Sequence, residues 1–255
     1  MDTRWITFDL DGTLMQNPFG NWVFPEIGEL ISQNTNKKLD VRTVMIEEHN
    51  LRMKQNRLIE AYNWDEILCK ILRDYQLDLE IRIEDLVKKH SVSPKIYLLE
   101  DHLLESLTRI KSKGIRLAIV TNGYRKYQQP VVEALKLSGL FDYFITPDQI
   151  GYAKPDERIL SELLNQGTVL AHVGDRIDHD VYLANKLNIC SVFISRKLPQ
   201  EVLTLPPMQR MEHPLFIGFY QQKWMKETGQ LFDHENQLGL PKVVIQSIEE
   251  LSFLF

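Results

Sequence analysis

The feature of this sequence that most constrains its fold is the alternation of short apolar runs with amphipathic stretches. The runs are rich in β-branched residues and lack clean polar alternation, which is typical of strands buried on both faces of a parallel sheet. We expect strands at residues 5–8, 115–120, 143–145, 169–173, 189–194 and 243–245. This order predicts an α/β fold, a Rossmann-like parallel sheet with helices on both faces.

Two amphipathic patterns between these runs predict helices that end at glycines. One contains Leu103, Leu107 and Ile110 before Gly114, and the other runs from Val131 to Leu137 before Gly139. Glycine is common just beyond the last turn of a helix because it adopts the left-handed conformation at little cost.

The stretch from about Asn17 to Lys95 has helical periodicity and no convincing strand, so we expect a helical insertion after the first strand. The apolar spacing indicates one helix that contains Val44 and reaches Leu58, another over residues 64–75, and a third that contains Ile83 and Val87. We therefore predict a split core of residues 1–16 and 96–255 with a helical cap of residues 17–95, and hinges near residues 15–19 and 93–97.

Composition excludes several classes of protein. Of the 255 residues, 44 % are hydrophobic, and the net charge of −5 argues against a general binder of nucleic acid or anionic membranes. The two cysteines, Cys69 and Cys190, form neither a disulfide framework nor a CxxC metal site, and we expect both to be small core residues. No apolar run is long enough to span a bilayer. We expect a cytoplasmic monomer or homodimer with no nucleic-acid or membrane partner.

Carboxylates follow two of the expected strands. Asp9 and Asp11 precede Gly12 after the first strand, and Asp175, Asp178 and Asp180 follow the run at 169–173. The carboxyl ends of parallel strands face the usual ligand crevice of an open α/β sheet. An Asp-Gly pair is also common in simple turns, and an Asp can merely cap a helix. Clustered carboxylates repel one another unless a cation neutralises them, and such oxygen ligands suit Mg²⁺ with a substrate phosphate.

Two further segments offer groups that bind phosphate. Thr121 and Asn122 stand before Gly123 at the end of the second long run, where a hydroxyl and backbone N–H groups can face an anion. Lys154 lies just before Pro155. Each signal is weak alone, because a lone lysine is usually a solvated surface residue.

Taken in order, the segments 9–13, 121–123, 154–155 and 174–180 resemble the four motifs of the haloacid dehalogenase superfamily. The helical insertion after the first motif resembles the C1 cap of subfamily I members. The amino-acid sequence of residues 121–155 is similar to that of the nucleotidase-like phosphatases of that group.

The resemblance implies a Mg²⁺-dependent phosphomonoester hydrolase that acts through an aspartyl-phosphate. Asp9 would be the nucleophile, and Asp11 the general acid and base. The metal ligands would be Asp9, Asp175 and the backbone carbonyl of Asp11, while Asp180 would orient a metal-bound water or Lys154 from behind. Thr121, Asn122 and Lys154 would hold the phosphoryl oxygens. The expected substrate is a small phosphorylated metabolite, with a nucleoside monophosphate as one candidate.

Other functions stay open. The dehalogenases of the superfamily lack a carboxylate two residues after the nucleophile, so Asp11 favours phosphoryl transfer. Phosphomutases have similar core motifs, and a binding or regulatory module could keep the fold with little turnover. A phosphoacceptor domain of the response-regulator type also combines aspartates, a threonine and a lysine, but the Asp-x-Asp-Gly-Thr spacing and the helical insertion fit it poorly.

Several further residues have two interpretations. We expect His172 to be a core histidine and His179 to be a surface residue at a helix start. Arg125 either contacts substrate or is solvated. Trp22 and Phe24 either line a substrate pocket or pack in the core. The proline-rich, aromatic region 199–241 is either a connection that packs on the sheet or an oligomerisation surface.

Overall fold

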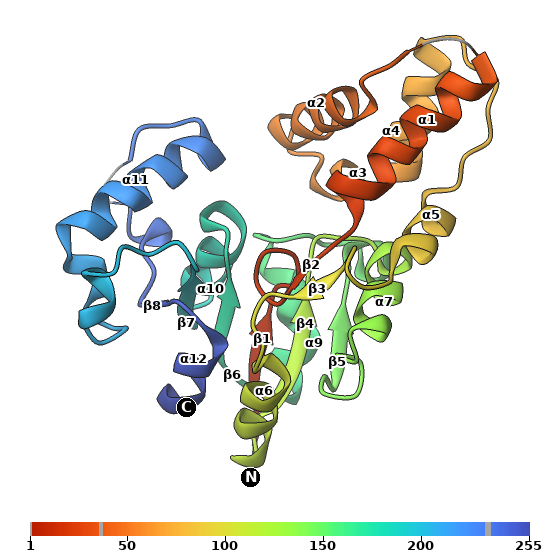
Figure 1. The fold of residues 1–255 in the computed structure, drawn as a ribbon. Coiled ribbons are helices and arrows are strands. Elements are labelled where there is room, and N and C mark those ends of the chain that lie inside the picture. The colour runs from red at the N-terminus through yellow and green to blue at the C-terminus, as the bar shows by residue number, and fades with distance from the viewer. Residues whose placement is uncertain (1, 36–37, 233–235) are drawn as a thin grey trace.

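The computed structural model describes residues 2–35, 38–232 and 236–255, and a parallel sheet forms its centre (Figure 1). In these residues the main sheet has six strands in the order β5-β4-β1-β6-β7-β8, and every neighbouring pair is parallel. The strands are β1 (Thr3–Phe8), β4 (Arg116–Val120), β5 (Tyr143–Ile145), β6 (Gly167–Gly174), β7 (Cys190–Ile194) and β8 (Val243–Ile245). All six lie where the apolar runs predict them, and the α/β fold class is confirmed.

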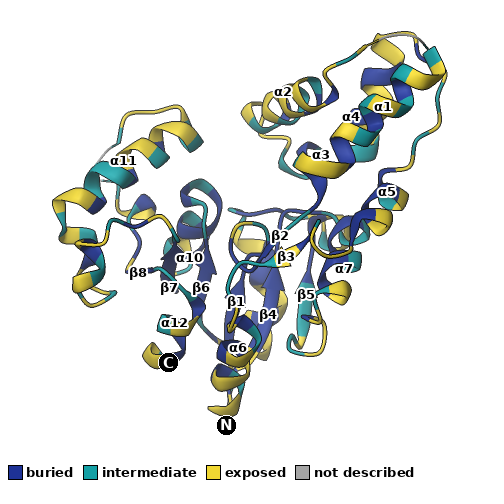
Figure 2. Cartoon of the chain, viewed as in Figure 1, coloured by how far each residue is buried: buried dark blue, intermediate teal, exposed yellow. Residues whose placement is uncertain are grey.

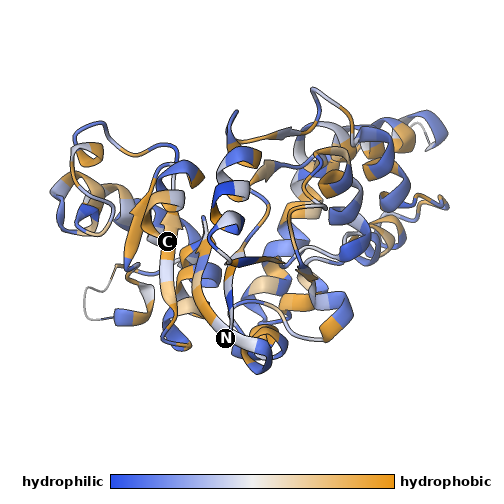
Figure 3. Cartoon of the chain, turned by 90° about the horizontal axis from the view of Figure 1, so that it is seen from below, coloured by the Kyte–Doolittle hydropathy of each residue, from blue (hydrophilic) through white to orange (hydrophobic). Residues whose placement is uncertain are grey.

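Side chains alternate between the two faces of this sheet, and each face is covered by helices. Ile6 and Phe8 pack in one cluster with α6 (Leu103–Ser112), α7 (Arg125–Ala134) and α12 (Ile248–Leu254). Trp5, from the same strand, packs in another cluster with α9 (Ser161–Gln166) and α10 (Tyr182–Lys186). Burial on both faces explains why the strands read as continuous apolar runs. In Figure 3 the apolar colour follows the strands, whereas the outer helices are largely hydrophilic.

The insertion after β1 is helical and projects away from the sheet (Figure 1). It consists of η1 (Phe19–Val23), α1 (Phe24–Thr35), α2 (Val41–Lys54), α3 (Leu58–Ala61), α4 (Trp64–Asp74) and α5 (Ile83–His90). The two connectors pair with each other as antiparallel strands β2 (Met15–Gln16) and β3 (Tyr97–Leu98). The boundaries of the predicted cap at residues 17 and 95 fall beside these two connectors.

Two predicted helix boundaries are wrong. The helix expected to reach Leu58 ends at Lys54, because Asn56 takes a left-handed conformation with φ 58° and starts a turn before α3. Helix α7 ends at Ala134, and Lys136, with φ 60°, supplies the left-handed residue that we expected from Gly139. Helix α1 was not among the predicted helices.

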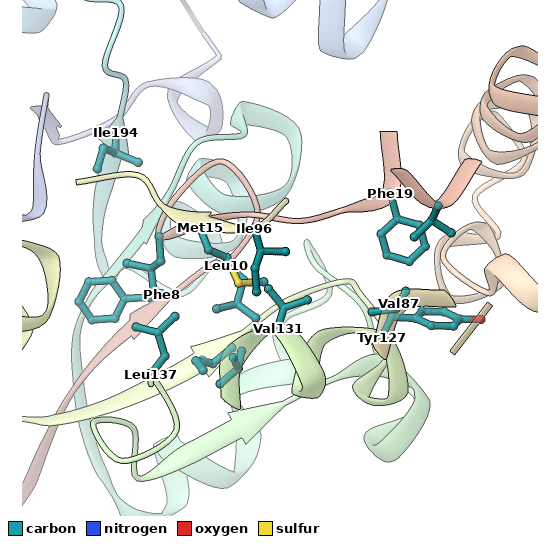
Figure 4. Packing of buried hydrophobic residues seen from close by; sticks show 14 of the residues in the cluster. Phe8, Leu10, Met15, Phe19, Val87, Ile96, Tyr127, Val131, Leu137 and Ile194 are labelled. Carbon is teal, nitrogen blue, oxygen red and sulfur yellow. The ribbon is translucent and has the colours of Figure 1, made fainter. Parts of the chain in front are cut away.

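The apolar core of the sheet continues into the helical insertion. Phe19 of η1 and Val87 of α5 lie beside Tyr127 of α7 (Figure 4), and the Phe19 and Tyr127 ring centroids are 5.7 Å apart. Figure 2 shows the buried residues running from the strands into the inner faces of these helices. The insertion is therefore packed onto α7.

The region after β7 forms its own layer at the β7–β8 end of the sheet. Its main element is α11 (Pro214–Thr228), whose Phe216, Tyr220 and Trp224 are buried against Phe193 and Val244 of the sheet. This packing supports the interpretation of region 199–241 as a connection that covers the sheet. The remaining short elements are α8 (Pro147–Ile150), η2 (Glu157–Leu160), η3 (Ile177–Val181), η4 (Val202–Thr204), η5 (Arg210–Glu212) and η6 (Gln237–Gly239).

The prediction that Cys69 belongs to the core is wrong. Cys69 is exposed, because the buried face of α4 is formed by the i, i+4 pairs Ile67–Ile71 and Leu68–Leu72, and residue 69 points away from both. Cys190 is half-buried against the main core cluster. Within the part of the chain that the structure describes, helices of membrane-spanning length and hydrophobicity are absent.

Candidate active site

The predicted site residues meet where three neighbouring strands end. Asp9 follows β1, Thr121 follows β4, and Asp175 follows β6, and these strands are adjacent in the order β4-β1-β6. The chain moves from β1 to β4 on one side and later returns to β6 on the other, so β1 lies at the switch point of the sheet. Ligands bind at such points in open α/β sheets because the loops there diverge.

The loop after β1 brings Asp9 and Asp175 together. The amides of Thr13, Leu14 and Met15 all donate to the carbonyl of Leu10, which closes a tight turn. Gly12 in this turn has φ +80°, and a Cβ atom there would lie 2.9 Å from the carboxyl carbon of Asp175. Only glycine therefore lets the loop approach the Asp175 carboxylate this closely.

Lys154 is the central cation of the site. Its side chain is buried, and Nζ lies 2.7 Å from Asp9 Oδ1 and 2.5 Å from Asp180 Oδ1. Asn122 fixes the lysine from behind: its Oδ1 accepts from the Lys154 amide at 2.7 Å and its Nδ2 donates to the Lys154 carbonyl at 3.0 Å. Burial alone would lower the pKa of Lys154, but the two carboxylates outweigh it and raise this pKa, so the ammonium stays charged.

Asp180 is bound on all sides by the protein. Besides Lys154, it accepts from the Arg176 amide at 3.0 Å and lies 3.0 Å from His172 Nε2. Burial alone would raise the pKa of Asp180, but Lys154 and His172 outweigh it and hold this pKa well below its usual range. His172 is a buried strand residue as predicted, and its Nδ1 lies 2.8 Å from the Thr7 hydroxyl.

The carboxylates of Asp9, Asp175 and Asp180 can hold a metal ion. One oxygen from each lies within 4.8 Å of the others. Burial raises the pKa of Asp9, and burial also raises that of Asp175 to about 7, with further increases from Asp9 and Asp180. Both shifts show that burial, and after it the neighbouring carboxylates, disfavours the ionised forms, so a cation would stabilise them. An all-oxygen donor set suits a hard cation such as Mg²⁺. The residues present therefore fit the ion that the sequence predicts.

Asp11 is held apart from this cluster by two amides. Asn17 donates to its Oδ1 at 2.7 Å and Gln128 donates to its Oδ2 at 2.6 Å. Burial raises the pKa of Asp11, and these hydrogen bonds offset only part of the increase. A carboxyl group of this kind can carry a proton, as a general acid must. The structure thus separates the Asp11 side chain from the candidate metal ligands.

Thr121 and Gly123 shape the phosphate-binding loop that the sequence predicts. Thr121 is buried, and its Oγ1 accepts from the Gly123 amide at 3.1 Å, which leaves the hydroxyl proton available to an anion. A Cβ atom at Gly123 would lie 2.1 Å from Gln128 Nε2, so the glycine makes room for the side chain that binds Asp11.

The helical insertion reaches the site at two places. The Tyr62 ring, between α3 and α4, lies 6.4 Å from the ring of His179. Asp65 of α4 accepts from the Tyr127 hydroxyl at 2.9 Å and from Lys126 Nζ at 2.5 Å, both on α7. The prediction that His179 is a surface residue is wrong, since this insertion helps to bury it. Burial lowers the pKa of His179 to about 4, so its ring is neutral at pH 7.

The weaker candidates lie elsewhere. Arg125 is half-buried: its guanidinium lies 4.1 Å from the centre of the Phe144 ring and donates to the Phe144 carbonyl at 2.9 Å, so these contacts bind it to β5. Phe24 is buried in the core, which confirms one of its two interpretations. Trp22 is 40 % exposed, with Lys95 Nζ 4.9 Å from its ring.

Four residues of the site were not predicted. Asn17 and Gln128 bind Asp11, and Lys223 and Glu227 of α11 approach the Asp175 loop. Gln128 lies five residues after Gly123, on the helix that follows the predicted phosphate loop, which is the one local signal that could have identified it. Lys223 has no such signal, because η3, α10, β7 and a long connection separate it from Asp175 in the sequence.

Comparison with known proteins agrees with this geometry. A family model described as haloacid dehalogenase-like hydrolase matches residues 3–187. Glyceraldehyde 3-phosphate phosphatase from Methanocaldococcus jannaschii is 24 % identical over 199 residues, which cover 74 % of this chain and 83 % of that protein. A phosphoglycolate phosphatase from Colwellia psychrerythraea is 33 % identical over 99 residues, or 37 % of this chain and 43 % of that protein.

Among solved structures, a haloacid dehalogenase-type phosphatase from Thermococcus onnurineus aligns with a TM-score of 0.67. The alignment covers 100 % of this chain and 97 % of that chain at 20 % identity. An L-2-haloacid dehalogenase from Xanthobacter autotrophicus aligns with a TM-score of 0.57 at 19 % identity, over 99 % of this chain and 98 % of that chain. These likenesses concern the fold.

Replacement of Lys154 by methionine should destabilise the protein strongly. Lys154→Met leaves Asp9 and Asp180 buried without their shared counter-charge, and breaking such a network costs about 3–5 kcal/mol. Urea unfolding at pH 7 measures this loss, with the exposed Lys38→Met as the matched control. A loss below about 1 kcal/mol would show that Lys154 does not neutralise the pair.

The stability of the metal-free protein should depend on Asp175 in a defined pH window. Burial raises the pKa of this carboxyl group from its ordinary 3.8 to about 7, so the fold favours the protonated form. That contribution to stability is fully present below the ordinary pKa and is lost as the pH rises through 7. In EDTA, Asp175→Asn should therefore match the wild type near pH 4 and be at least about 1 kcal/mol more stable at pH 8. Lower stability of the Asp175→Asn variant than of the wild type at pH 8 would contradict the assignment.

Proposed function

The chain belongs to the haloacid dehalogenase-like hydrolases, and from that premise we propose that it hydrolyses phosphate monoesters of small metabolites through an aspartyl-phosphate. The observation that carries this proposal is that two nearby carboxylates have different binding partners. Asp9 lies against Lys154 at the strand ends, whereas Asp11 is held separately by Asn17 and Gln128. One carboxylate is thus available for attack and the other for proton transfer.

In the first half-reaction an Asp9 oxygen attacks phosphorus and the bond to the ester oxygen breaks. The leaving oxygen takes the proton from the Asp11 carboxyl group, so an alcohol departs and Asp11 becomes a carboxylate. Lys154 and the Thr121 hydroxyl donate to the phosphoryl oxygens as their charge redistributes. The raised pKa of Asp11, caused mainly by burial, favours its protonated form before this step.

In the second half-reaction water attacks phosphorus and the bond to Asp9 breaks. The Asp11 carboxylate takes a proton from that water, which restores its starting state. Inorganic phosphate leaves and the Asp9 carboxylate is regenerated. Because both oxygens of Asp11 are bound by side-chain amides, its position is fixed in both steps.

A divalent cation fits this scheme. Asp9 and Asp175 would hold Mg²⁺ with the backbone carbonyl of Asp11, and Asp180 would stay with Lys154. When bound, the ion supplies positive charge that reduces the repulsion between the Asp9 carboxylate and the phosphate oxygens.

We assign the substrate's leaving group to the space between the core and residues 17–95, which act as a cap. Tyr62 beside His179 and the Asp65 contacts with Tyr127 and Lys126 support this assignment, because they bring the insertion to the edge of the site. The relatives named after glyceraldehyde 3-phosphate and phosphoglycolate support short phosphate esters as substrates. Nucleoside monophosphates stay in the substrate class to be tested.

Turnover should require Asp9 and a divalent cation. We expect p-nitrophenyl phosphate hydrolysis with Mg²⁺, a fall to background in EDTA, and at least about a thousandfold loss in Asp9→Asn. A panel of glyceraldehyde 3-phosphate, phosphoglycolate and nucleoside monophosphates then ranks the substrates by kcat/KM. Robust turnover by Asp9→Asn would refute the covalent route, and an inactive pure wild type across the panel would favour a binding module.

Loss of Gln128 should matter most when the leaving group is poor. Gln128→Met keeps the length of the side chain but cannot donate to Asp11, so proton transfer to the leaving oxygen suffers. We expect kcat/KM to fall about tenfold or more for an alkyl phosphate and less than about threefold for 2,4-dinitrophenyl phosphate, whose leaving group needs no proton.

The control for this experiment is Gln129→Met, one residue along the same helix. Gln129 pairs with Arg125 and Glu133 and makes no contact with Asp11 in the hydrogen bonds of the described residues. Equal losses on both substrates in Gln128→Met would indicate general damage to the site and would contradict a role for Gln128 in positioning Asp11.

A further inference from the structure

Helix α11 lies beyond residues 3–187, which the family model matches, yet it packs directly on the acidic loop after β6. Its buried face is formed by Phe216, Tyr220 and Trp224, spaced four residues apart, against Ile177 and Val181 of η3. In Figure 1 this helix stands beside β7 and β8, on the opposite side of the sheet's centre from the helical insertion. The helix is therefore anchored to the loop that carries Asp175.

Two charged residues of α11 lie next to this apolar stripe, at an i, i+4 spacing, and both face the site. Lys223 Nζ lies 2.7 Å from Glu227 Oε1 and 3.8 Å from Asp175 Oδ2. Glu227 Oε2 accepts from the backbone amide of Ile177 at 2.7 Å. The Glu227 side chain is 7 % exposed and that of Lys223 is 22 % exposed, so both charges are largely removed from water.

Each of the two lysines of the site pairs with a different set of carboxylates. Lys154 pairs with Asp9 and Asp180, whereas Lys223 bridges Asp175 and Glu227. Among the ion pairs of the described residues, Lys223 makes the one that involves Asp175. The second candidate metal ligand therefore has a cation of its own, supplied by an element far from it in the sequence.

We propose that Lys223 is an internal counter-ion that competes with the divalent cation for Asp175, and that Glu227 holds Lys223 and the Asp175 loop in place. This inference rests on the proposed function, because it concerns the same cation. A positive charge beside a ligand carboxylate weakens the binding of a second cation, while a negative charge behind it strengthens the binding. Lys223 and Glu227 thus set the affinity of the site for Mg²⁺ in opposite directions.

Helix α11 thus places a positive charge beside one candidate metal ligand. With Lys223 beside it, the Asp175 carboxylate keeps a compensating charge when no metal is bound, which limits the repulsion from Asp9 and Asp180. On binding, the cation takes over that compensation, and Lys223 remains paired with Glu227 at 2.7 Å. The amide of Ile177 stays fixed on Glu227 in either state, so the loop itself need not move.

The test measures Mg²⁺ binding without substrate, by calorimetry and by the Mg²⁺-dependent rise in melting temperature. Lys223→Met should tighten Mg²⁺ binding by about three- to tenfold, because it removes the competing charge. Glu227→Gln keeps an acceptor for the Ile177 amide but loses the negative charge, so it should weaken binding by about three- to tenfold. Lys226→Met, exposed on the same helix, should change binding less than twofold.

Opposite changes in the two variants distinguish an electrostatic role from structural damage, which would weaken binding in both. Weaker or unchanged Mg²⁺ binding in Lys223→Met would overturn the proposal while leaving the proposed function intact, provided that the wild type binds Mg²⁺ and hydrolyses phosphate esters. A wild type that binds no divalent cation would overturn both. As an independent readout, the Mg²⁺ concentration for half-maximal activity should fall in Lys223→Met.

Discussion

Everything at the carboxyl edge of this sheet depends on one buried ammonium group between two carboxylates. Lys154 contacts Asp9 at 2.7 Å and Asp180 at 2.5 Å, and it is almost completely buried. Without it, the ends of β1 and β6 would bring the carboxylates of Asp9 and Asp180 together in a buried region, where unpaired like charges are costly. Asn122 holds the lysine backbone from both its amide and its carbonyl. The lysine thereby allows these strand ends to converge, and it holds the Asp9 carboxylate that we propose as the nucleophile.

After Lys154 has paired with Asp9 and Asp180, the carboxylate of Asp175 remains as a third acidic group of the cluster, and it connects the fold to the proposed chemistry. The pKa of Asp175 is raised because burial and the charges of Asp9 and Asp180 disfavour its ionised form. The Lys223 ammonium offsets part of this increase. In the proposed reaction a divalent cation would stabilise these carboxylates, and a substrate phosphate would complete the ligands of that cation. Asp11 is held by the side-chain amides of Asn17 and Gln128 and takes part in none of the ion pairs of the described residues, so its carboxyl group can exchange a proton without breaking one.

Much of this could be predicted from the sequence because it depends on local patterns. The apolar runs located the six strands, and the aspartates that follow them lie at one edge because parallel strands end together. The break between α2 and α3 was missed because it depends on Asn56 in a left-handed conformation, which the apolar spacing does not record. His179 was expected at the surface, and its burial depends on packing that includes Tyr62 from a distant segment. Lys223 was missed for the same reason: only the fold brings α11 to Asp175.

The central claim is that Asp9 becomes phosphorylated while Asp11 moves the protons. The most direct measurement is a rapid acid quench during a single turnover with Mg²⁺ and a phosphate ester, followed by borohydride reduction and peptide mass spectrometry. Borohydride converts an aspartyl-phosphate to homoserine, so this account predicts homoserine at position 9 and an unmodified Asp11. Turnover with an unmodified Asp9, or a label on any other residue, would contradict it.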